Sequence, residues 1–438
     1  MLSKLRILGI HLLLLAAVGG AATAASLTFG RMPQNARVGH FPVLPARLEP
    51  AITTGPAWLA MKGIPSNVRA ARRWRRSAAM RVIVVSPWEV RLRVGGQVVR
   101  AIPSRQRSPS LTELVRLIAD NSWISRPRPG VTYLKAGLML TAGTSMTVAP
   151  PAARLLLADR PGVFVCADHA TLVINSATVE STRPQYTGAY RPFVLADKHS
   201  RMQITKARLT GLGWDWSDSY GVAWKNGSTG GATRSTFSHN YFGLYTGSVS
   251  GLKFSHDTVV KNYFYGFDPH TYSRNLTITE NTVAGNGRHG IIFSGHVTGS
   301  TVAGNTVQGN AANGIMMDEG STGNVIRDNV VTGNHGDGIV LASSPANQIA
   351  GNTVRGNRVG LRLTRTGPRS VRLVGNRVAG NSLNVEGIAE TSGNTIASDT
   401  RLAWNGDSLA VIGVLGAALA MVTLISLRSC LLSGRETR

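Results

Sequence analysis

The sequence predicts an all-β fold, a parallel β-helix that occupies residues 130–400. A glycine precedes a short apolar run seven times between residues 201 and 396, at intervals of 22, 23, 24, 24, 24 and 22 residues. A second motif, Asn-x-Val-x-Gly-Asn, repeats in phase with it. A period of about 20–50 residues is typical of a solenoid, in which each unit buries its apolar edge by stacking on the next. The repeat glycines are Gly221, Gly243, Gly266, Gly290, Gly314, Gly338 and Gly360.

Each repeat contains short β-branched runs that are broken by Gly and Asn and show no helical periodicity. Short strands that turn a corner and return once per coil form a parallel β-helix. The Asn that ends each repeat of the second motif suits a turn, and stacked Asn side chains can hydrogen-bond from coil to coil. We therefore assign these Asn residues a structural role.

The region before the solenoid, residues 26–129, contains a predicted helix. Ser110 and Glu113 have the spacing of a capping box, and apolar residues follow on one helical face. This helix is expected to cover the open end of the β-helix, as solenoid termini require. A strand-like segment from Val82 has no role that the sequence reveals. The apolar residues of the helix are Leu111, Leu114, Val115, Leu117 and Ile118.

Both ends of the chain carry apolar segments. Residues 1–25 combine Lys4 and Arg6 with an apolar stretch and small residues, which predicts a secretory signal. Residues 408–427 hold no charge and are long enough for a membrane-spanning helix, and the arginines of residues 428–438 predict a cytoplasmic tail. We expect an exported protein, anchored once in the cell membrane, with its β-helix outside. The two cysteines, Cys166 and Cys430, exclude a disulfide framework.

The chain is strongly basic, with 47 Lys and Arg against 22 Asp and Glu and a formal net charge of +25. Such a charge concentrates polyanions near the surface. Nucleic acid is disfavoured as a partner outside a cell, whereas acidic polysaccharide and anionic lipid remain. Part of the charge lies in the segment Arg69–Arg81, which is equally consistent with a solvated or membrane-facing stretch.

Counting from the repeat glycine sorts each coil into two faces, because side chains alternate along a strand. Positions one and three residues after the glycine are apolar and predict the core. Positions two and four are mixed and predict the outer face. Since coils stack at about 4.8 Å, residues at one position form a column. The fourth position gives the column Lys225, Gly247, His270, Ser294 and Asp318, and the position before the glycine gives a neighbouring column with Tyr265 and His289.

One coil departs from the apolar repeat. Its sequence, YGFDPH, supplies a phenol at Tyr265, a carboxylate at Asp268 and an imidazole at His270, with Pro269 in a strand that proline should weaken. An exposed histidine near acids is often only solvated surface. The breach of the repeat makes a polymer-binding groove an equally good interpretation.

This coil, together with NLTITENTVAGNGRHGIIFS and NGIMMD downstream, resembles the mannuronan (alginate) C5-epimerases over residues 241–363, and the periplasmic type most closely. The resemblance implies a right-handed parallel β-helix that converts mannuronate to guluronate within a polymer and needs no cofactor. It implies His270 as the base that removes the C5 proton, Asp268 as its assistant, and Tyr265 in proton transfer.

The chain departs from the family pattern at Thr271, where periplasmic members often carry an acid, and at Gly295, where they carry an arginine that neutralises the substrate carboxylate. Lys225, Arg288 and His296 are the candidate replacements, and His289, Ser294 and Asp318 are expected to line the groove. A metal site from His239, His256 and His270 is disfavoured, because the first two lie off the column.

Three functions remain open. The first is epimerisation of an extracellular polyuronate. The second is a polysaccharide lyase, which shares proton abstraction but then cleaves the chain. The third is a non-catalytic carbohydrate-binding solenoid that lacks a neutralising cation. The sequence leaves the polymer, calcium dependence and oligomeric state undetermined.

Overall fold

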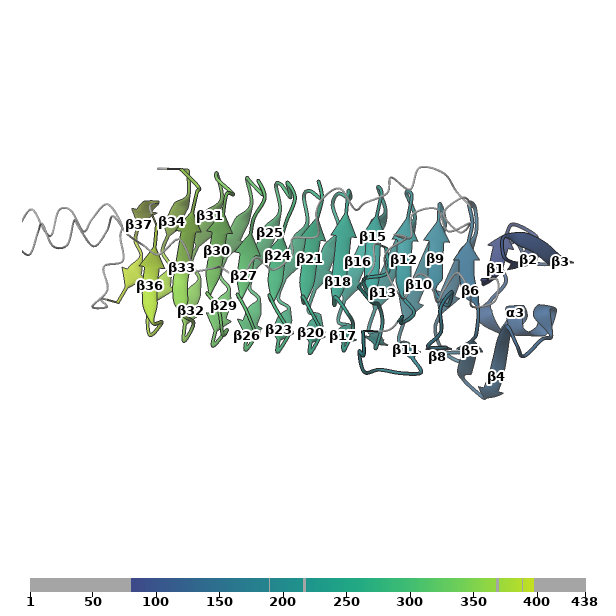
Figure 1. Cartoon of the computed structure of the whole chain (residues 1–438). Helices are drawn as coiled ribbons and strands as arrows, with labels where there is room; N and C mark the ends of the chain where they lie inside the picture. The colour runs from purple at the N-terminus through teal and green to yellow at the C-terminus, as the bar shows by residue number, and fades with distance from the viewer. Residues whose placement is uncertain (1–79, 189, 216–217, 368–369, 388, 398–438) are drawn as a thin grey trace, which may run out of the picture. The chain divides into compact units, whose positions relative to one another are not determined.

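The structure is a computed structural model that describes residues 80–397, apart from 189, 216–217, 368–369 and 388. These residues belong to one compact unit, Ile52–Arg438. The chain winds through three long sheets, so that consecutive coils lie side by side along one axis (Figure 1). This arrangement is the parallel β-helix that the repeat predicts.

Each coil visits the three sheets in the same order. Sheet 1 contains, in spatial order, β3 (Gln97–Pro103), β2 (Glu89–Val94), β1 (Arg81–Ser86), β6 (Gly137–Leu140), β9 (Val165–Asp168), β12 (Val194–Asp197), β15 (Val222–Lys225), β18 (Leu244–Gly247), β21 (Phe267–His270), β24 (Ile291–Phe293), β27 (Ile315–Met317), β30 (Ile339–Ala342), β33 (Val359–Thr364) and β36 (Leu383–Glu386). Sheet 2 contains β7 (Ser145–Val148), β10 (Thr171–Asn175), β13 (Arg201–Thr205), β16 (Thr229–Thr233), β19 (Lys253–Ser255), β22 (Thr277–Thr279), β25 (Thr301–Ala303), β28 (Val325–Arg327), β31 (Gln348–Ala350), β34 (Arg372–Val374) and β37 (Glu390–Ser392). Sheet 3 contains β4 (Ile124–Arg128), β5 (Val131–Leu134), β8 (Arg154–Leu157), β11 (Thr178–Ser181), β14 (Arg208–Thr210), β17 (Thr236–Ser238), β20 (Thr258–Val260), β23 (Thr282–Ala284), β26 (Thr306–Gln308), β29 (Val330–Thr332), β32 (Thr353–Arg355), β35 (Arg377–Val378) and β38 (Thr395–Ile396).

The core lies between the three sheets and is continuous from coil to coil. The positions that the repeat predicts as inward are buried there, including Trp224, Phe267 and Phe293. Since no coil can bury these side chains alone, stacking supplies most of the hydrophobic stabilisation. The expected core face is therefore confirmed.

Asparagine side chains form two ladders along the coils. Asn286 Nδ2 donates to Asn310 Oδ1 at 2.9 Å, and Asn310 repeats the contact with Asn334. Asn281 and Asn305 make the same contact in the second ladder. These amides are buried and satisfy neighbouring backbone groups, which confirms their structural role.

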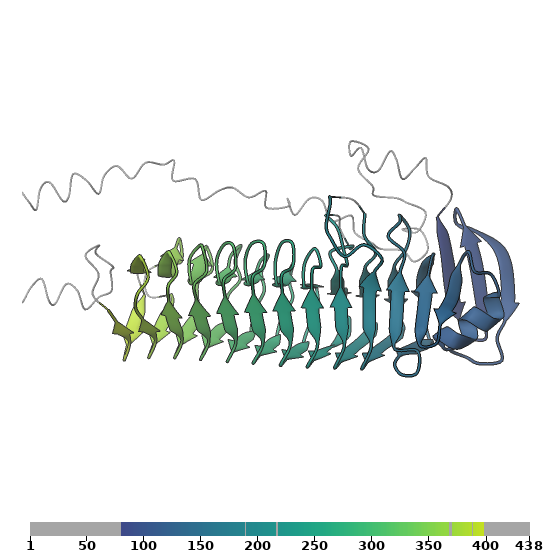
Figure 2. The same ribbon diagram turned by 90° about the horizontal axis from the view of Figure 1, so that it is seen from below.

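The N-terminal end of the solenoid is covered by a helix and a hairpin. The predicted helix is α3 (Leu111–Ile118), and Leu114 on its apolar face joins the core. Ser110 Oγ accepts from Glu113 N at 3.2 Å, whereas the Glu113 carboxylate binds Arg116, so only half of the capping box forms. The segment from Val82 forms β1, which pairs in parallel with β6 and antiparallel with β2, so β1–β3 extend sheet 1 beyond the first coil (Figure 2).

The terminal predictions fall mostly outside the described residues. These include the signal sequence 1–25, residues 69–79 of the basic segment, and the span 408–427 with its tail. Within residues 80–397 as described, no helix has the length and apolar character needed to cross a membrane. Cys166 is a buried free thiol.

The second ladder begins at an acid, and this generates a prediction about stability. Asp257 N donates to Asn281 Oδ1, but the Asp257 carboxylate cannot donate an amide proton as the asparagines do. Burial raises the pKa of Asp257 to about 7. A raised carboxyl pKa means that the native state loses stability as the pH rises from the unfolded value near 4 to about 7.

We expect Asp257→Asn to raise the thermal midpoint above that of the parent at pH 8, because an amide restores the ladder without charge. The gain should shrink as the pH falls below 7. Thermal unfolding of both chains between pH 4 and 8 measures it. Asn305→Asp is the matched control and should have the opposite effect at pH 8. A gain that is independent of pH would contradict this account.

Candidate functional site

The polar column on sheet 1 exists in the register that the repeat predicts. Lys225 pairs with Gly247, and Gly247 pairs with His270 in the next coil. His270 then bridges to Ser294, whose hydroxyl hydrogen-bonds the Asp318 carboxylate one coil further. Burial raises the pKa of Asp318 to about 6. The column therefore brings a cation, an imidazole and a carboxyl to one edge of sheet 1.

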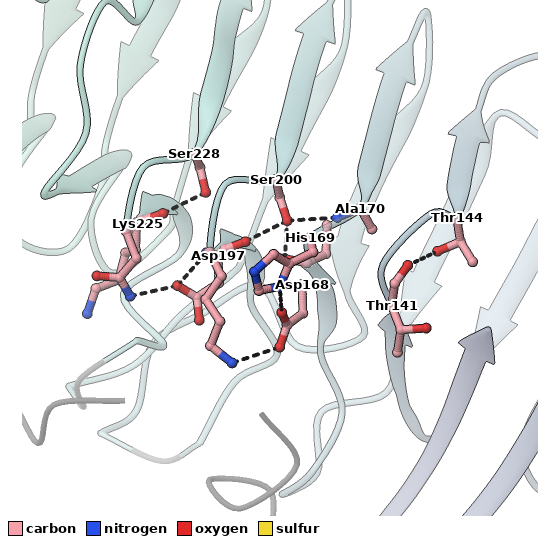
Figure 3. A network of polar contacts seen from close by, with 12 residues as sticks. Thr141, Thr144, Asp168, His169, Ala170, Asp197, Ser200, Lys225 and Ser228 are labelled. Carbon is pink, nitrogen blue, oxygen red and sulfur yellow. Dashed lines mark hydrogen bonds and ion pairs between the residues drawn. The ribbon is translucent and has the colours of Figure 1, made fainter. Parts of the chain in front are cut away.

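The strand ends that carry this column are fixed by hydroxyl caps in the following turn. In each case a Ser or Thr donates to the carbonyl three residues earlier, at the strand end or next to it, and this keeps the corner tight while the side chain turns outward (Figure 3). The pairs are Thr144 with Thr141, Ser200 with Asp197, Ser228 with Lys225, and Ser273 with His270.

Upstream of Lys225 the same corner carries acids. Asp197 and Asp168 are in register on β12 and β9. Lys198 binds Asp168 at 2.9 Å, and Asn226 Nδ2 donates to Asp197 at 2.7 Å (Figure 3). Burial raises the pKa of the Asp197 carboxyl. Along the solenoid, the column thus changes from acids that bind neighbouring side chains to the basic residues Lys225 and His270.

His270 is half-buried and its ring contacts Tyr245 and Thr271. Its ring stacks against Tyr245 with centroids 6.0 Å apart, and Nδ1 lies 2.5 Å from Thr271 Oγ1. When Nδ1 carries the proton and donates to Thr271, Nε2 is the basic nitrogen. A side chain at Gly295 would begin 3.5 Å from His270 Cε1, so the glycine leaves space beside the ring. His270 can therefore act as a base toward a ligand on the outer face.

Tyr265 lies at the opposite edge of the coil and contacts Arg288. Arg288 Nη1 donates to the phenol oxygen at 3.4 Å. Burial, together with the nearby Asp268 carboxylate, raises the pKa of Tyr265 above its ordinary value, so the phenol is protonated at neutral pH. Burial lowers the pKa of Arg288 but leaves it a cation.

His289 supports this edge rather than reacting there. Its ring stacks on Tyr265 with centroids 5.4 Å apart, and its Nδ1 accepts from Asn313 N at 3.1 Å. Burial and the Arg288 charge lower the pKa of His289 to about 3. A neutral, buried ring in this position orients the Tyr265 phenol.

The cation candidates differ in what they contact. Lys225 Nζ donates to Asp218 in a buried ion pair and lies 5.9 Å from the Tyr245 ring centroid. His296 is exposed on the turn after Ser294, where its ring meets Tyr272 edge-on at 5.2 Å. Arg288 contacts Tyr265, both through the hydrogen bond to the phenol and with its guanidinium 5.6 Å from the ring centroid.

The outer face of sheet 1 is more enclosed than the sequence predicts. Asp268 is only 2% exposed, and Tyr245 and Ala223 are buried as well. An aromatic cluster that includes Tyr220, Phe242 and Tyr245 packs on the outer side of the strands. The prediction that Asp268 lies on an exposed outer face is therefore wrong, because these rings exclude water from its side chain.

Two contributors were missed by sequence reasoning. Tyr245 occupies the same column as Asp268, so counting columns could have selected it. A single aromatic residue in a coil is, however, equally typical of ordinary packing. Asp218 belongs to a loop outside the repeat and offered no signal before its pairing with Lys225 was known.

Comparisons with known proteins agree with this fold. The family model described as a right handed beta helix region matches residues 162–330. The chain is 28% identical over 208 residues to the mannuronan C5-epimerase of Pseudomonas syringae pathovar tomato, covering 43% of this chain and 39% of that protein. It is 29% identical over 196 residues to the enzyme of Pseudomonas fluorescens, covering 40% and 37%. The chain thus spans about two fifths of the length of these curated relatives.

Solved structures give the same result. The periplasmic alginate epimerase AlgG superposes with a TM-score of 0.63 at 23% identity, covering 78% of this chain and 86% of that one. A mutant of that enzyme gives 0.59 at 25% identity, covering 67% and 72%. The fold and site define a right-handed parallel β-helix protein. More particularly, the chain is a mannuronan C5-epimerase-like β-helix.

A further family model, described as periplasmic copper-binding protein (NosD), matches residues 269–399. In the part of the chain that the structure describes, no group of three or more His, Cys, Asp or Glu is arranged to hold a metal ion. The described residues therefore do not fit a copper site.

The Lys225–Asp218 pair yields a prediction about folding. Removing one partner of a buried ion pair leaves the other charge uncompensated, at a cost of about 3–5 kcal/mol. We expect Lys225→Met to destabilise the chain more than the double change Asp218→Asn with Lys225→Met. Denaturant unfolding of the parent, both single variants and the double variant measures the coupling. Equal losses in the single and double variants would contradict the pairing.

Proposed function

We propose that the chain is a C5-epimerase of an acidic polysaccharide and converts mannuronate to guluronate residues within the polymer. The observation that carries the proposal is the pair of proton-transfer groups on one coil, the half-buried His270 and the protonated Tyr265. Epimerisation needs a base on one face of the sugar ring and a donor on the other. The distant similarity to mannuronan C5-epimerases supports this reaction class.

In the proposed mechanism His270 removes the C5 proton, and the electrons move into the adjacent carboxylate to form an enolate. Tyr265 then donates its proton from the opposite face, which inverts C5. The His270 proton and the Tyr265 phenolate exchange with solvent before the next turnover. Asp268 is buried beside these groups and keeps the phenol protonated, since its charge helps to raise the Tyr265 pKa.

The enolate requires a cation to balance its second negative charge. Arg288 is the favoured group, because its guanidinium already binds the phenol that donates the proton. Lys225 shares its charge with Asp218, so we assign it to orienting a neighbouring sugar. Ser294, Asp318 and His289 line or support the groove, and His296 lies at its margin on the turn.

We also propose that the chain is exported and anchored in the cell membrane. An exported chain would meet extracellular polyuronate, and the solved relative is described as periplasmic. Residues 1–25 and 408–427 supply the proposed signal and single membrane anchor. The cell membrane and the polysaccharide are therefore the proposed partners.

The first test is proton NMR of polymannuronate incubated with the purified chain in heavy water, beside His270→Ala. We expect guluronate signals with deuterium at C5 in the parent and none in the variant. Unsaturated chain ends would instead identify a lyase. Binding without any spectral change, in parent and variant alike, would indicate a non-catalytic carbohydrate-binding protein.

Tyr265→Phe separates the two proton transfers. Because His270 remains, the C5 proton should still exchange with solvent, but the missing donor should prevent inversion. We expect deuterium in mannuronate residues, while guluronate formation falls by about 10²–10⁴-fold, the usual contribution of a positioned acid. The same NMR assay measures both signals. Guluronate formation at the parental rate would exclude Tyr265 as the donor.

A further inference from the structure

A hollow lies on sheet 2, on the face of the coil next to the candidate active site. Its volume is about 380 Å³, and it spans β13, β16 and β19. The turn 226–228 connects β15 on sheet 1 directly to β16, so the two faces share the same coils. Nothing in the proposed catalytic cycle uses this face.

The middle strand of the hollow, β16, carries two glycines, and one of them, Gly230, lines the hollow. Gly231 pairs in register with Gln203 on one side and Lys253 on the other. Its φ of 141° and the closeness of the Lys253 carbonyl leave no room for a Cβ atom. Gln203 and Lys253, which both line the hollow, therefore lie on the strands to either side of a position that has no side chain.

Charged and polar groups surround this position. Arg201 and Lys253 line the hollow, are exposed, and make no ion pair with any described residue. Arg274 is also exposed, and its backbone forms a β-bridge with Ser250, which lines the hollow. The lining contains hydroxyl groups and an amide but no Asp or Glu. The site thus combines free cations with hydrogen-bonding groups that suit sugars.

We propose that this hollow is a second binding site for acidic polysaccharide, in which Arg201 and Lys253 bind uronate carboxylates while Gln203 and Thr233 hydrogen-bond sugar hydroxyls. The two cations are two strands and two residues apart, about 12 Å between their Cα atoms, which suits carboxylates on separate sugars of one chain rather than a single phosphate. The choice of uronate rests on the proposed function. Such a site holds the polymer on the molecule between turnovers at the active site.

The test compares the full-length parent with the double variant Arg201→Glu, Lys253→Glu. Binding of polymannuronate is measured by calorimetry, and conversion of a short mannuronate oligosaccharide by NMR. We expect affinity for the long polymer to fall by at least about tenfold, because simultaneous binding at two sites is lost. Conversion of the short oligosaccharide should be unchanged.

The matched control is Arg372→Glu, Arg377→Glu, which makes the same change of charge at exposed positions away from the hollow. An equal loss of polymer affinity in both double variants would show that only the overall charge matters, and it would contradict the proposed site. Unchanged polymer binding, or a loss confined to anionic phospholipid vesicles, would overturn it too. The two proposals fail separately: binding without conversion rejects only the epimerase, and conversion with unaltered binding rejects only the second site.

Discussion

The stacking of coils in strict register is the constraint on which the rest of the structure depends. Each coil pairs its strands with those of the coils before and after it, and the buried Asn281 and Asn286 ladders fix the corners. Because no coil can slip by one residue without turning its core side chains outward, every outward residue has a fixed neighbour. His270 therefore faces Ser294 and Gly247 as a consequence of packing on the other side of the same strand.

Burial then gives the fixed residues their chemistry. The aromatic cluster over sheet 1 excludes water from Asp268 and packs against Tyr265, which is partly buried. A desolvated phenol resists ionisation, and a desolvated imidazole such as His289 resists protonation. In such surroundings a cation and a developing negative charge attract each other more strongly than in water. The same burial that keeps the proposed proton donor, Tyr265, protonated would thus assist formation of an enolate.

The repeat allowed much of this to be predicted from the sequence. Glycine spacing identified the coils, the inward positions such as Trp224, and the order of the polar column, because these follow from a period of two along a strand. The enclosure of Asp268 and the role of Asp218 could not be predicted. They depend on side chains from loops outside the repeat, whose course is determined only by tertiary packing.

Gly295 shows how backbone geometry limits where the neutralising cation can be. Its φ of 72° lies in the left-handed region, where a side chain is strained, and a Cβ atom there would lie 3.3 Å from Thr271 N and 3.5 Å from His270 Cε1. An arginine at this position would therefore carry backbone strain and pack closely against Thr271. Arg288 approaches from the opposite edge of the coil, through Tyr265, and leaves His270 undisturbed. In the proposed mechanism the cation therefore belongs with the proton donor rather than with the base, so formation of the enolate and its protonation would depend on one guanidinium.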